Sequence, residues 1–364
     1  MDQEYNRRLK NIEAALERWL PENSGPAWTR EIFPGLEKKL SPESIKVLLA
    51  PGRDLLTRGG KRWRPMLMTL VCESLGGGDA SLPLVPLVEF CHNASLIHDD
   101  IEDNSEQRRG MPAIHRIYGV DTAINSGCFL YFLSLNSIES WAAELVKNGH
   151  SDAAEYKSVI YKLWAEYMRK LHIGQAMDIN WHRNFSLIPA LEEYYLMCGL
   201  KTGSLARFAA CLGVYAACAA GVKIAVVDQA MEHLGEAAEK LGVGFQILDD
   251  VKNLTTGIPG KKRGDDVVEG KKSLPVLLYL HRYPEKKDFI CRCFNAAKTS
   301  GVAVPEVEEM INALAAAGVL DEAKENGLAM IARAGEIFAS EGQAGFTISG
   351  EGRVLLAGLT RLIS

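Results

Sequence analysis

The stretch EFCHNASLIHDDIED, residues 89–103, joins an apolar run to a cluster of acidic residues at its end. The apolar residues recur at spacings of three and four, which is typical of a helix that buries one face. Asp99 and Asp103 are four positions apart, so a helix places both carboxylates on one face, roughly 5–6 Å apart at Cβ, with Asp100 beside them. Carboxylates crowded at a helix C-terminus repel one another and oppose the helix dipole. A bound divalent cation relieves both penalties, and oxygen ligands beside a phosphate favour Mg²⁺.

The same spacing recurs along most of the chain, whereas the alternating pattern of strands is scarce. No Pro-, Ser- or Gly-rich linker divides the sequence, and residues 201–220 are apolar nearly all round, as expected at the centre of a bundle. We therefore expect an all-α helical bundle with a single domain over residues 1–364, in which residues 1–58 form an N-terminal helix and an irregular extension. The other expected helices cover 63–76, 82–103, 118–147, 151–179, 189–199, 201–220, 224–252, 272–282, 286–299, 304–316, 320–341 and 350–362.

The composition argues against several classes of protein. Of the 364 residues, 47% are hydrophobic, and the net charge of −5 provides no basic field to attract nucleic acid. The eight cysteines form no CxxC pair, which indicates a reducing compartment and neither a disulfide framework nor a zinc site. The first twenty residues are too charged for a signal peptide, and no run of about 18 uncharged apolar residues predicts stable membrane insertion. We expect a cytoplasmic protein.

A second acidic cluster ends another apolar stretch, FQILDD at residues 245–250, and a polar glycine loop follows it. One DDxxD cluster can be a solvated helix end, but two acidic helix ends in one chain indicate facing carboxylates with metal ions between them. Basic motifs accompany both clusters: GGKRWRP at 59–65, RRG at 108–110, KT at 201–202 and a lysine-rich loop at 261–272. Each motif alone is typical of a solvated surface, where we expect Arg62, Lys262, Arg263 and Lys272. Together the acidic and basic motifs predict a pocket for two polyphosphates.

These motifs, in this order, resemble the trans-isoprenyl diphosphate synthase (polyprenyl synthetase) family. The resemblance runs from about Gly59 to Pro275 and includes GGKRWRP, EFCHNASLIHDDIED, RRGMP, GQAMD at 174–178, KT, FQILDD and GKKRGDD…EGKKS. It implies an all-α bundle around a deep central cavity, usually a homodimer. It also implies that the chain condenses isopentenyl diphosphate with an allylic diphosphate in the presence of Mg²⁺.

The resemblance also implies roles for individual residues. Three Mg²⁺ ions and the allylic diphosphate would be bound by Asp99, Asp103 and Asp249, supported by Asp100 and Asp250. The allylic diphosphate would be held by Arg108, Lys201, Gln246 and a loop lysine, for which Lys261, Lys262 and Lys271 are alternatives. Isopentenyl diphosphate would be held by Lys61, Arg64, His92 and Arg109. Thr202, Gln246 and the backbone at the helix start near Lys201 would help to stabilise the allylic cation. Without the resemblance, His92 would be interpreted as a core histidine.

Two positions depart from the family pattern: Asn253 and Cys128 stand where the resemblance leads us to expect Asp. Neither change removes a core ligand, but Asn253 is a weaker metal ligand and leaves room for a weakened or specialised enzyme.

Product length would depend on the residues one or more turns before Asp99, namely Cys91, Ala94 and Ser95. Their small side chains leave the expected cavity open and favour a product of C20 or longer. The aromatic residues Phe129, Tyr131 and Phe132 could form a deeper floor or simply belong to the core. A short-chain (C15) synthase, a terpene cyclase and a non-catalytic partner subunit are the alternative functions.

Overall fold

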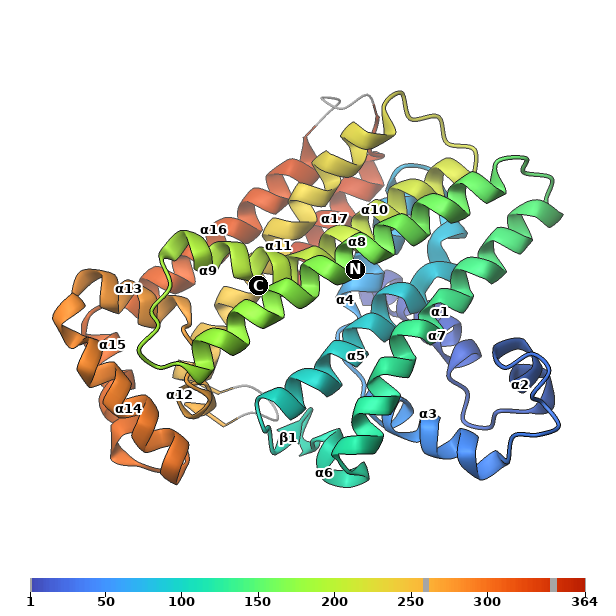
Figure 1. Ribbon diagram of the computed structural model, residues 1–364. Coiled ribbons are helices and arrows are strands. Elements are labelled where there is room, and N and C mark those ends of the chain that lie inside the picture. The colour runs from blue at the N-terminus through green and yellow to red at the C-terminus, as the bar shows by residue number, and fades with distance from the viewer. Residues whose placement is uncertain (1, 258–261, 341–345, 364) are drawn as a thin grey trace.

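The computed structural model describes residues 2–257, 262–340 and 346–363, and its regular structure is almost entirely helical (Figure 1). The expected all-α fold is confirmed. The α-helices are α1 (Asp2–Trp19), α2 (Pro26–Ile32), α3 (Pro42–Thr57), α4 (Trp63–Ser74), α5 (Val85–Glu102), α6 (Ile114–Tyr118), α7 (Val120–Lys147), α8 (Ala153–Arg183), α9 (Leu191–Cys198), α10 (Ser204–Ala219), α11 (Val227–Thr255), α12 (Asp265–Glu269), α13 (Leu274–Arg282), α14 (Lys287–Ser300), α15 (Pro305–Ala316), α16 (Val319–Ala339) and α17 (Gly350–Ile363).

Short elements connect these helices. Two 3₁₀ turns, η1 (Gly78–Leu84) and η3 (Pro284–Lys286), precede α5 and α14, and a π-helical turn, η2 (Gly199–Gly203), joins α9 to α10. A small antiparallel hairpin of β1 (Gln107–Arg108) and β2 (Met111–Pro112) follows α5.

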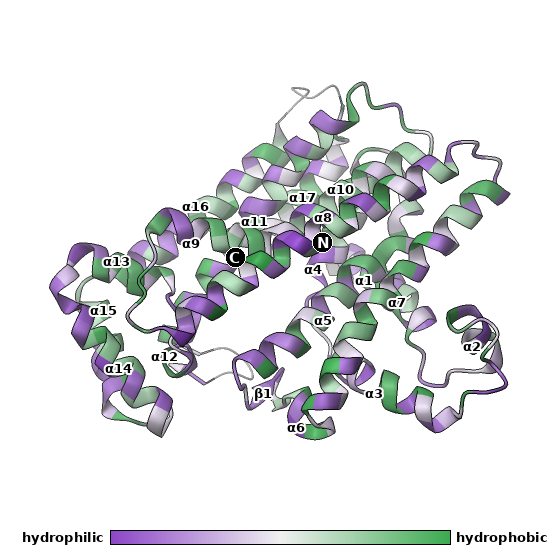
Figure 2. Ribbon diagram, viewed as in Figure 1, coloured by the Kyte–Doolittle hydropathy of each residue, from purple (hydrophilic) through white to green (hydrophobic). Residues whose placement is uncertain are grey.

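The core is organised around α10 and α11. Almost every residue of α10 is buried, as its apolar sequence predicts, and this helix packs between α4 and α11. The longer helix α11 contributes residues to three hydrophobic clusters, including Leu234, Ile247 and Leu254. In Figure 2 many peripheral helices carry hydrophobic and hydrophilic residues in alternating bands, as amphipathic helices do. Whether the chain forms a single domain stays a prediction.

Two helical stretches are long and apolar enough to cross a membrane by length and composition. They are Gly78–Glu102 and Leu191–Ala219, and 67% and 83% of their most apolar windows are buried inside the bundle. Because most of this apolar surface already packs against protein, both stretches are core helices of the fold.

The expectation of an irregular segment after α1 is wrong, because α2 and α3 lie there. Both helices have Pro in their first turn, Pro26 and Pro42, where the missing N–H has no intrahelical partner to lose. Pro51 lies inside α3 and is buried in the core. A proline can thus start a helix as well as end one.

Candidate active site

The first acidic cluster lies at the end of α5 and faces α8 and η2. Asp99 accepts hydrogen bonds from Lys201 Nζ at 3.1 Å and Gln175 Nε2 at 2.9 Å, and Arg108 lies 3.5 Å away. Burial alone would raise the pKa of Asp99, but Lys201, Lys271 and Arg108 outweigh burial and hold it well below its usual range. Asp99 is therefore a carboxylate surrounded by cations.

The other two aspartates of this cluster differ in role. Asp100 is completely buried and accepts a hydrogen bond from Arg108 Nε at 2.9 Å, so it anchors the arginine of β1. The side chain of Asp103 is 2% exposed, and its nearest cation-capable neighbour is His182, with Oδ1 and Nδ1 3.8 Å apart. Burial, followed by Asp99 and Glu269, raises the pKa of Asp103 well above its usual value. A cation bound next to Asp103 would offset the repulsion from Asp99 and Glu269 and favour the charged form of the carboxyl.

The second acidic cluster lies near the end of α11. Asp250 is buried and accepts hydrogen bonds from Tyr194 Oη and Gln246 Nε2, both at 2.9 Å. Burial, followed by the neighbouring Asp266, raises the pKa of Asp250 to about 7. Asp249 is half-buried and interacts electrostatically with Lys61, so this helix end lies next to the first basic motif.

Lys201 and Thr202 lie in η2, although the sequence predicted that they start an α-helix. Lys201 Nζ donates to Asp178 of α8 at 2.6 Å as well as to Asp99, and Thr202 Oγ1 donates to Gln246 Oε1 at 2.8 Å. Glycines allow this turn to contact its neighbours closely. A Cβ on Gly174 would lie 2.4 Å from the Lys201 nitrogen, and one on Gly242 would lie 2.9 Å from Gly203 Cα. The backbones of α8 and α11 thus pack directly against η2, the turn that carries Lys201 and Thr202.

Lys271 connects the two acidic clusters. Its Nζ lies 3.1 Å from Glu269 and 3.6 Å from Asp266, and it also interacts electrostatically with Asp99 and Asp103 of α5 and with Asp250 of α11. Burial would lower the pKa of Lys271, but these acids, beginning with Glu269, hold it well above its ordinary value. Of the other lysines considered for this role, Lys262 is exposed and Lys261 lies outside the described residues.

Two of the expected isopentenyl diphosphate residues, Arg64 and Arg109, act electrostatically on a third, His92, whereas the fourth, Lys61, interacts with Asp249. Four arginines, Arg62, Arg64, Arg108 and Arg109, act electrostatically on this histidine, and Arg64 Nη1 donates to His92 Nε2 at 3.4 Å. Burial, followed by Arg64 and Arg109, holds the pKa of His92 well below its ordinary value, so the ring is neutral. Burial also lowers the pKa of Arg64 and of Arg109 to about 10. This excess of buried positive charge favours an anion.

Two of the basic residues expected at the surface are buried. Arg62 is 3% exposed and forms ion pairs of 2.8 Å with Glu89 and with Glu13 of α1. Lys272 is 2% exposed and donates to the carbonyl oxygens of Trp181 and Gly270, at 3.0 and 2.9 Å. Arg62 pairs with acids that are distant in sequence, and Lys272 with main-chain carbonyl groups. The residue type alone does not predict such partners.

Several partners of the site were not assigned from sequence: Gln175, Asp178, His182 and Tyr194. The first three follow at positions i, i+3 and i+7 of α8, so they share one helix face. Gln175 and Asp178 belong to the GQAMD motif. That motif could have indicated that both residues lie in the site.

The residues expected to line a product cavity are partly placed by the structure. Cys91 and Ala94 are completely buried, Ser95 is half-buried, and the indole N–H of Trp164 donates to Cys91 Sγ at 3.4 Å. Tyr131 is buried, with its ring 5.9 Å from that of His98. Phe132 is 63% exposed and therefore does not form a floor. Phe129 stacks instead on Phe33 of the α2–α3 connection, at 5.9 Å.

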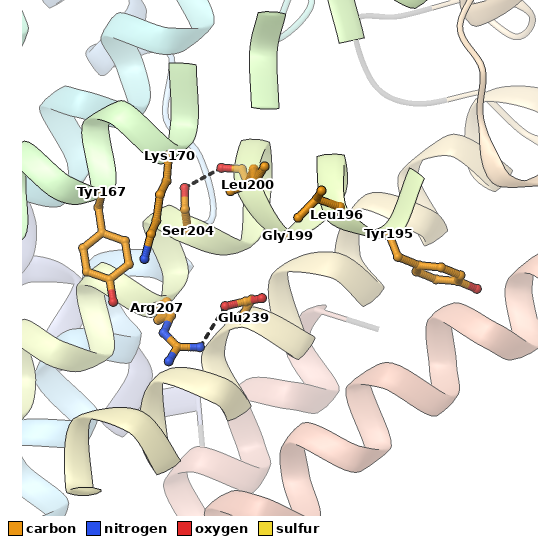
Figure 3. Close-up of a pocket in the computed structure, with 9 residues that line it drawn as sticks. All are labelled: Tyr167, Lys170, Tyr195, Leu196, Gly199, Leu200, Ser204, Arg207 and Glu239. Atoms are coloured by element: carbon orange, nitrogen blue, oxygen red, sulfur yellow. Dashed lines mark hydrogen bonds and ion pairs between the residues drawn. The ribbon is translucent and has the colours of Figure 1, made fainter. Parts of the chain in front are cut away.

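A separate hollow opens beside η2 and contains none of the expected site residues (Figure 3). Its two cations already have partners, since Lys170 lies 2.6 Å from Glu166 and Arg207 lies 3.0 Å from Glu239. The acidic clusters and the arginines around His92 are therefore the better candidate for the binding of charged substrates.

The acidic clusters suit a hard cation but do not form a complete metal site. In the parts of the chain that the structure describes, no three His, Cys, Asp or Glu side chains are grouped so that they could hold a metal ion. Asp100 Oδ2 and Asp103 Oδ1 are nevertheless buried without a hydrogen-bond partner among those residues. Carboxylate oxygens in this state fit Mg²⁺, which is bound by one or two carboxylates together with substrate phosphates.

The chain is similar in sequence to known proteins. The polyprenyl synthetase family model matches residues 45–314. The chain is 34% identical over 242 residues to geranylgeranyl pyrophosphate synthase 2 of Zymoseptoria tritici, a match covering 66% of each protein. It therefore spans about two thirds of the length of that relative. A short chain isoprenyl diphosphate synthase of Methanocaldococcus jannaschii is 34% identical over 267 residues, covering 72% of this chain and 74% of that protein.

Solved structures share the complete fold. The geranylgeranyl pyrophosphate synthetase of Pyrococcus horikoshii aligns with a TM-score of 0.77 and 26% identity, covering 99% of this chain and 97% of that one. A polyprenyl synthase of Caulobacter crescentus, complexed with calcium and isoprenyl diphosphate, aligns with a TM-score of 0.74 and 23% identity, covering 100% and 97%. The resemblance inferred from the motifs is thus confirmed, and the chain belongs to the polyprenyl synthetase family.

Proposed function

We propose that this protein is a Mg²⁺-dependent trans-prenyltransferase that condenses isopentenyl diphosphate with an allylic diphosphate into a linear polyprenyl diphosphate. The observation that carries the proposal is the position of Lys271, which interacts with carboxylates of both acidic clusters. Such a lysine between two acidic helix ends is suited to a diphosphate and its metal ions. Family membership and the arginines around His92 support a second diphosphate site next to it.

The two sites take different substrates. Lys61, Arg64, His92 and Arg109 hold isopentenyl diphosphate. The acid that acts on Arg64 and Arg109 is the buried Glu89, which also pairs with Arg62, so positive charge is in excess here. The allylic diphosphate is held by Arg108, Lys201, Gln246 and Lys271. Its Mg²⁺ ions, three in number, are held by Asp99, Asp103 and Asp249, with Asp100 and Asp250 as supporting residues.

Catalysis is electrostatic and uses no covalent nucleophile. The allylic C–O bond breaks, and its electron pair leaves with the diphosphate, whose growing charge Lys201, Lys271 and Arg108 stabilise. Bound Mg²⁺ adds Lewis-acid stabilisation of the same leaving group. The double bond of isopentenyl diphosphate then supplies the electrons for the new C–C bond, and the resulting cation loses a proton to the released diphosphate. The oxygens of Thr202 and Gln246, which are hydrogen-bonded to each other at 2.8 Å, stabilise the allylic cation.

Product length is proposed to be C20 or longer. The small buried side chains of Cys91 and Ala94 leave room before Asp99, and the names of several relatives refer to geranylgeranyl products. A C15 synthase remains the alternative product class. A terpene cyclase does not need the arginine cluster, and a non-catalytic subunit does not need both acidic clusters.

We further propose a cytoplasmic homodimer. Helix α7 exposes Val120, Ile124 and Phe132, at 48%, 44% and 63% exposure. Exposed apolar side chains on one helix suit a self-complementary contact between two copies.

One experiment tests the activity. The protein is incubated with Mg²⁺, labelled isopentenyl diphosphate and allylic primers of C5 to C20, and the products are separated by length. We expect chain elongation in the wild type and its loss in Asp99→Ala and Asp249→Ala, with both variants still folded by circular dichroism. Near-normal rates in both variants would overturn the proposal.

A further inference from the structure

We propose that Asn253, the last residue of the second acidic motif, is a positioning residue that holds the loop bearing Lys271 and does not contact substrate or metal. The catalytic consequence of this inference rests on the function proposed above. Asn253 is 0% exposed, in the last turns of α11.

Every polar group of the Asn253 side chain has a partner in one short segment. Its Oδ1 accepts from the Asp266 N–H at 3.1 Å, and its Nδ2 donates to the Lys262 carbonyl at 3.4 Å. The Asn253 carbonyl also accepts from the Gly264 N–H at 2.9 Å. An amide can accept on one side and donate on the other, whereas a carboxylate can only accept. The residue type therefore matches these partners.

The segment that Asn253 holds leads directly to Lys271. The Lys271 N–H donates to the Asp266 carbonyl at 2.9 Å, and the two side chains lie 3.6 Å apart. Glycines fix both ends of this path. Gly264 and Gly270 have φ of +88° and +79°, and a Cβ on Gly264 would lie 2.6 Å from Val307 Cγ1. A shift at residue 266 is therefore transmitted to Lys271.

The charge balance also favours a neutral residue at position 253. Asp250, one turn earlier on α11, and Asp266 are buried carboxylates that already repel each other. A third carboxylate on Asn253 would add like charge at a fully buried position and would oppose the Lys262 carbonyl oxygen. Asn253→Asp restores the acidic pattern common in the family, yet the structure predicts that this change weakens the site.

The test compares Asn253→Asp with Asn295→Asp, which makes the same chemical change at an exposed amide on α14. Hydrogen exchange of residues 262–268 is measured by mass spectrometry in the substrate-free protein. We expect exchange to be about tenfold faster in Asn253→Asp and unchanged in the control. Asn253→Ser, which keeps a shorter donor and acceptor, gives an intermediate result and serves if the first variant does not fold.

Kinetics provides the second measurement. We expect the KM for the allylic substrate to rise about tenfold in Asn253→Asp, while the KM for isopentenyl diphosphate stays within about twofold. Unchanged exchange together with Mg²⁺ activation at lower concentration would identify position 253 as a ligand position and overturn the inference. If the wild type transfers no prenyl group but exchange changes as expected, the proposed function fails while the anchoring role stands.

Discussion

Glu89 offers a sharp test of how the arginine cluster is stabilised. Its side chain is 2% exposed and lies 2.8 Å from Arg62, whose side chain is 1% exposed. The same carboxylate acts electrostatically on Arg64 and Arg109. Glu89→Gln keeps the shape of the residue but removes a charge that acts on two buried guanidinium groups, Arg62 and Arg64, and on the half-buried Arg109.

Removing one partner of a buried ion pair leaves an uncompensated buried charge, at a cost of about 3–5 kcal/mol. The matched control is Glu13→Gln, because Glu13 also lies 2.8 Å from Arg62 but its side chain is 45% exposed. Loss of an exposed pair costs at most about 1 kcal/mol. We therefore expect a large loss of unfolding free energy in urea for Glu89→Gln and a small one for Glu13→Gln.

Pyrophosphate adds an independent check on the same variant. If the cluster binds anions, pyrophosphate should stabilise Glu89→Gln more than the wild type, since the variant has more uncompensated positive charge. Equal stability losses in the two glutamine variants, or no extra stabilisation by pyrophosphate, would refute this reasoning.

Three further outcomes are expected. Ala94→Phe should shorten the product by at least one isoprene unit, because it fills a completely buried position near the acidic cluster, whereas Phe132→Ala should leave product length unchanged; chromatography of the products decides. Phe132→Glu should shift the protein to monomers in light scattering, while Val354→Glu, at a similarly exposed position on α17, should not. Burial lowers the pKa of Lys272 to about 8. The unfolded chain therefore binds a proton here between about pH 8 and 10.5 that the folded chain does not. The stability of the wild type relative to Lys272→Met should accordingly rise across that window in urea titrations, and a constant difference would contradict the assigned pKa.

The helices were predictable because their apolar spacing reflects local geometry. The expected helix at 304–316 corresponds to α15, and the expected helix at 350–362 to α17. The segment after α1 was expected to be irregular for a reason that local sequence cannot resolve. Pro26 and Pro42 are equally compatible with a break and with a first helical turn, and only the tertiary packing of α2 and α3 decides between them.

The candidate site was predictable as a set of motifs but not as a set of contacts. Charge and spacing identified Asp99 and Lys201, whereas nothing local to Arg62 indicates that Glu89, 27 residues away, draws it into the core. Asn253 is similar. The sequence marks it as a departure from an acidic pattern, and only its partners explain the amide. The roles of Arg62 and Asn253 therefore depend on polar partners that are distant in sequence, and residue type alone does not identify those partners.

The π-helical turn η2 has a consequence for the folding of the rod from Leu191 to Ala219. A π-turn accommodates one residue more than an α-turn, so the helix beyond it is rotated by about 100° relative to an uninterrupted one. Before the turn, Tyr194 and Met197 pack into one hydrophobic cluster; after it, Leu205 and Phe208 pack into another. The extra residue thus rotates the buried face of α10 relative to that of α9, so that one continuous helical segment packs into two hydrophobic clusters. Deleting it would leave one of those clusters without its facing side chains.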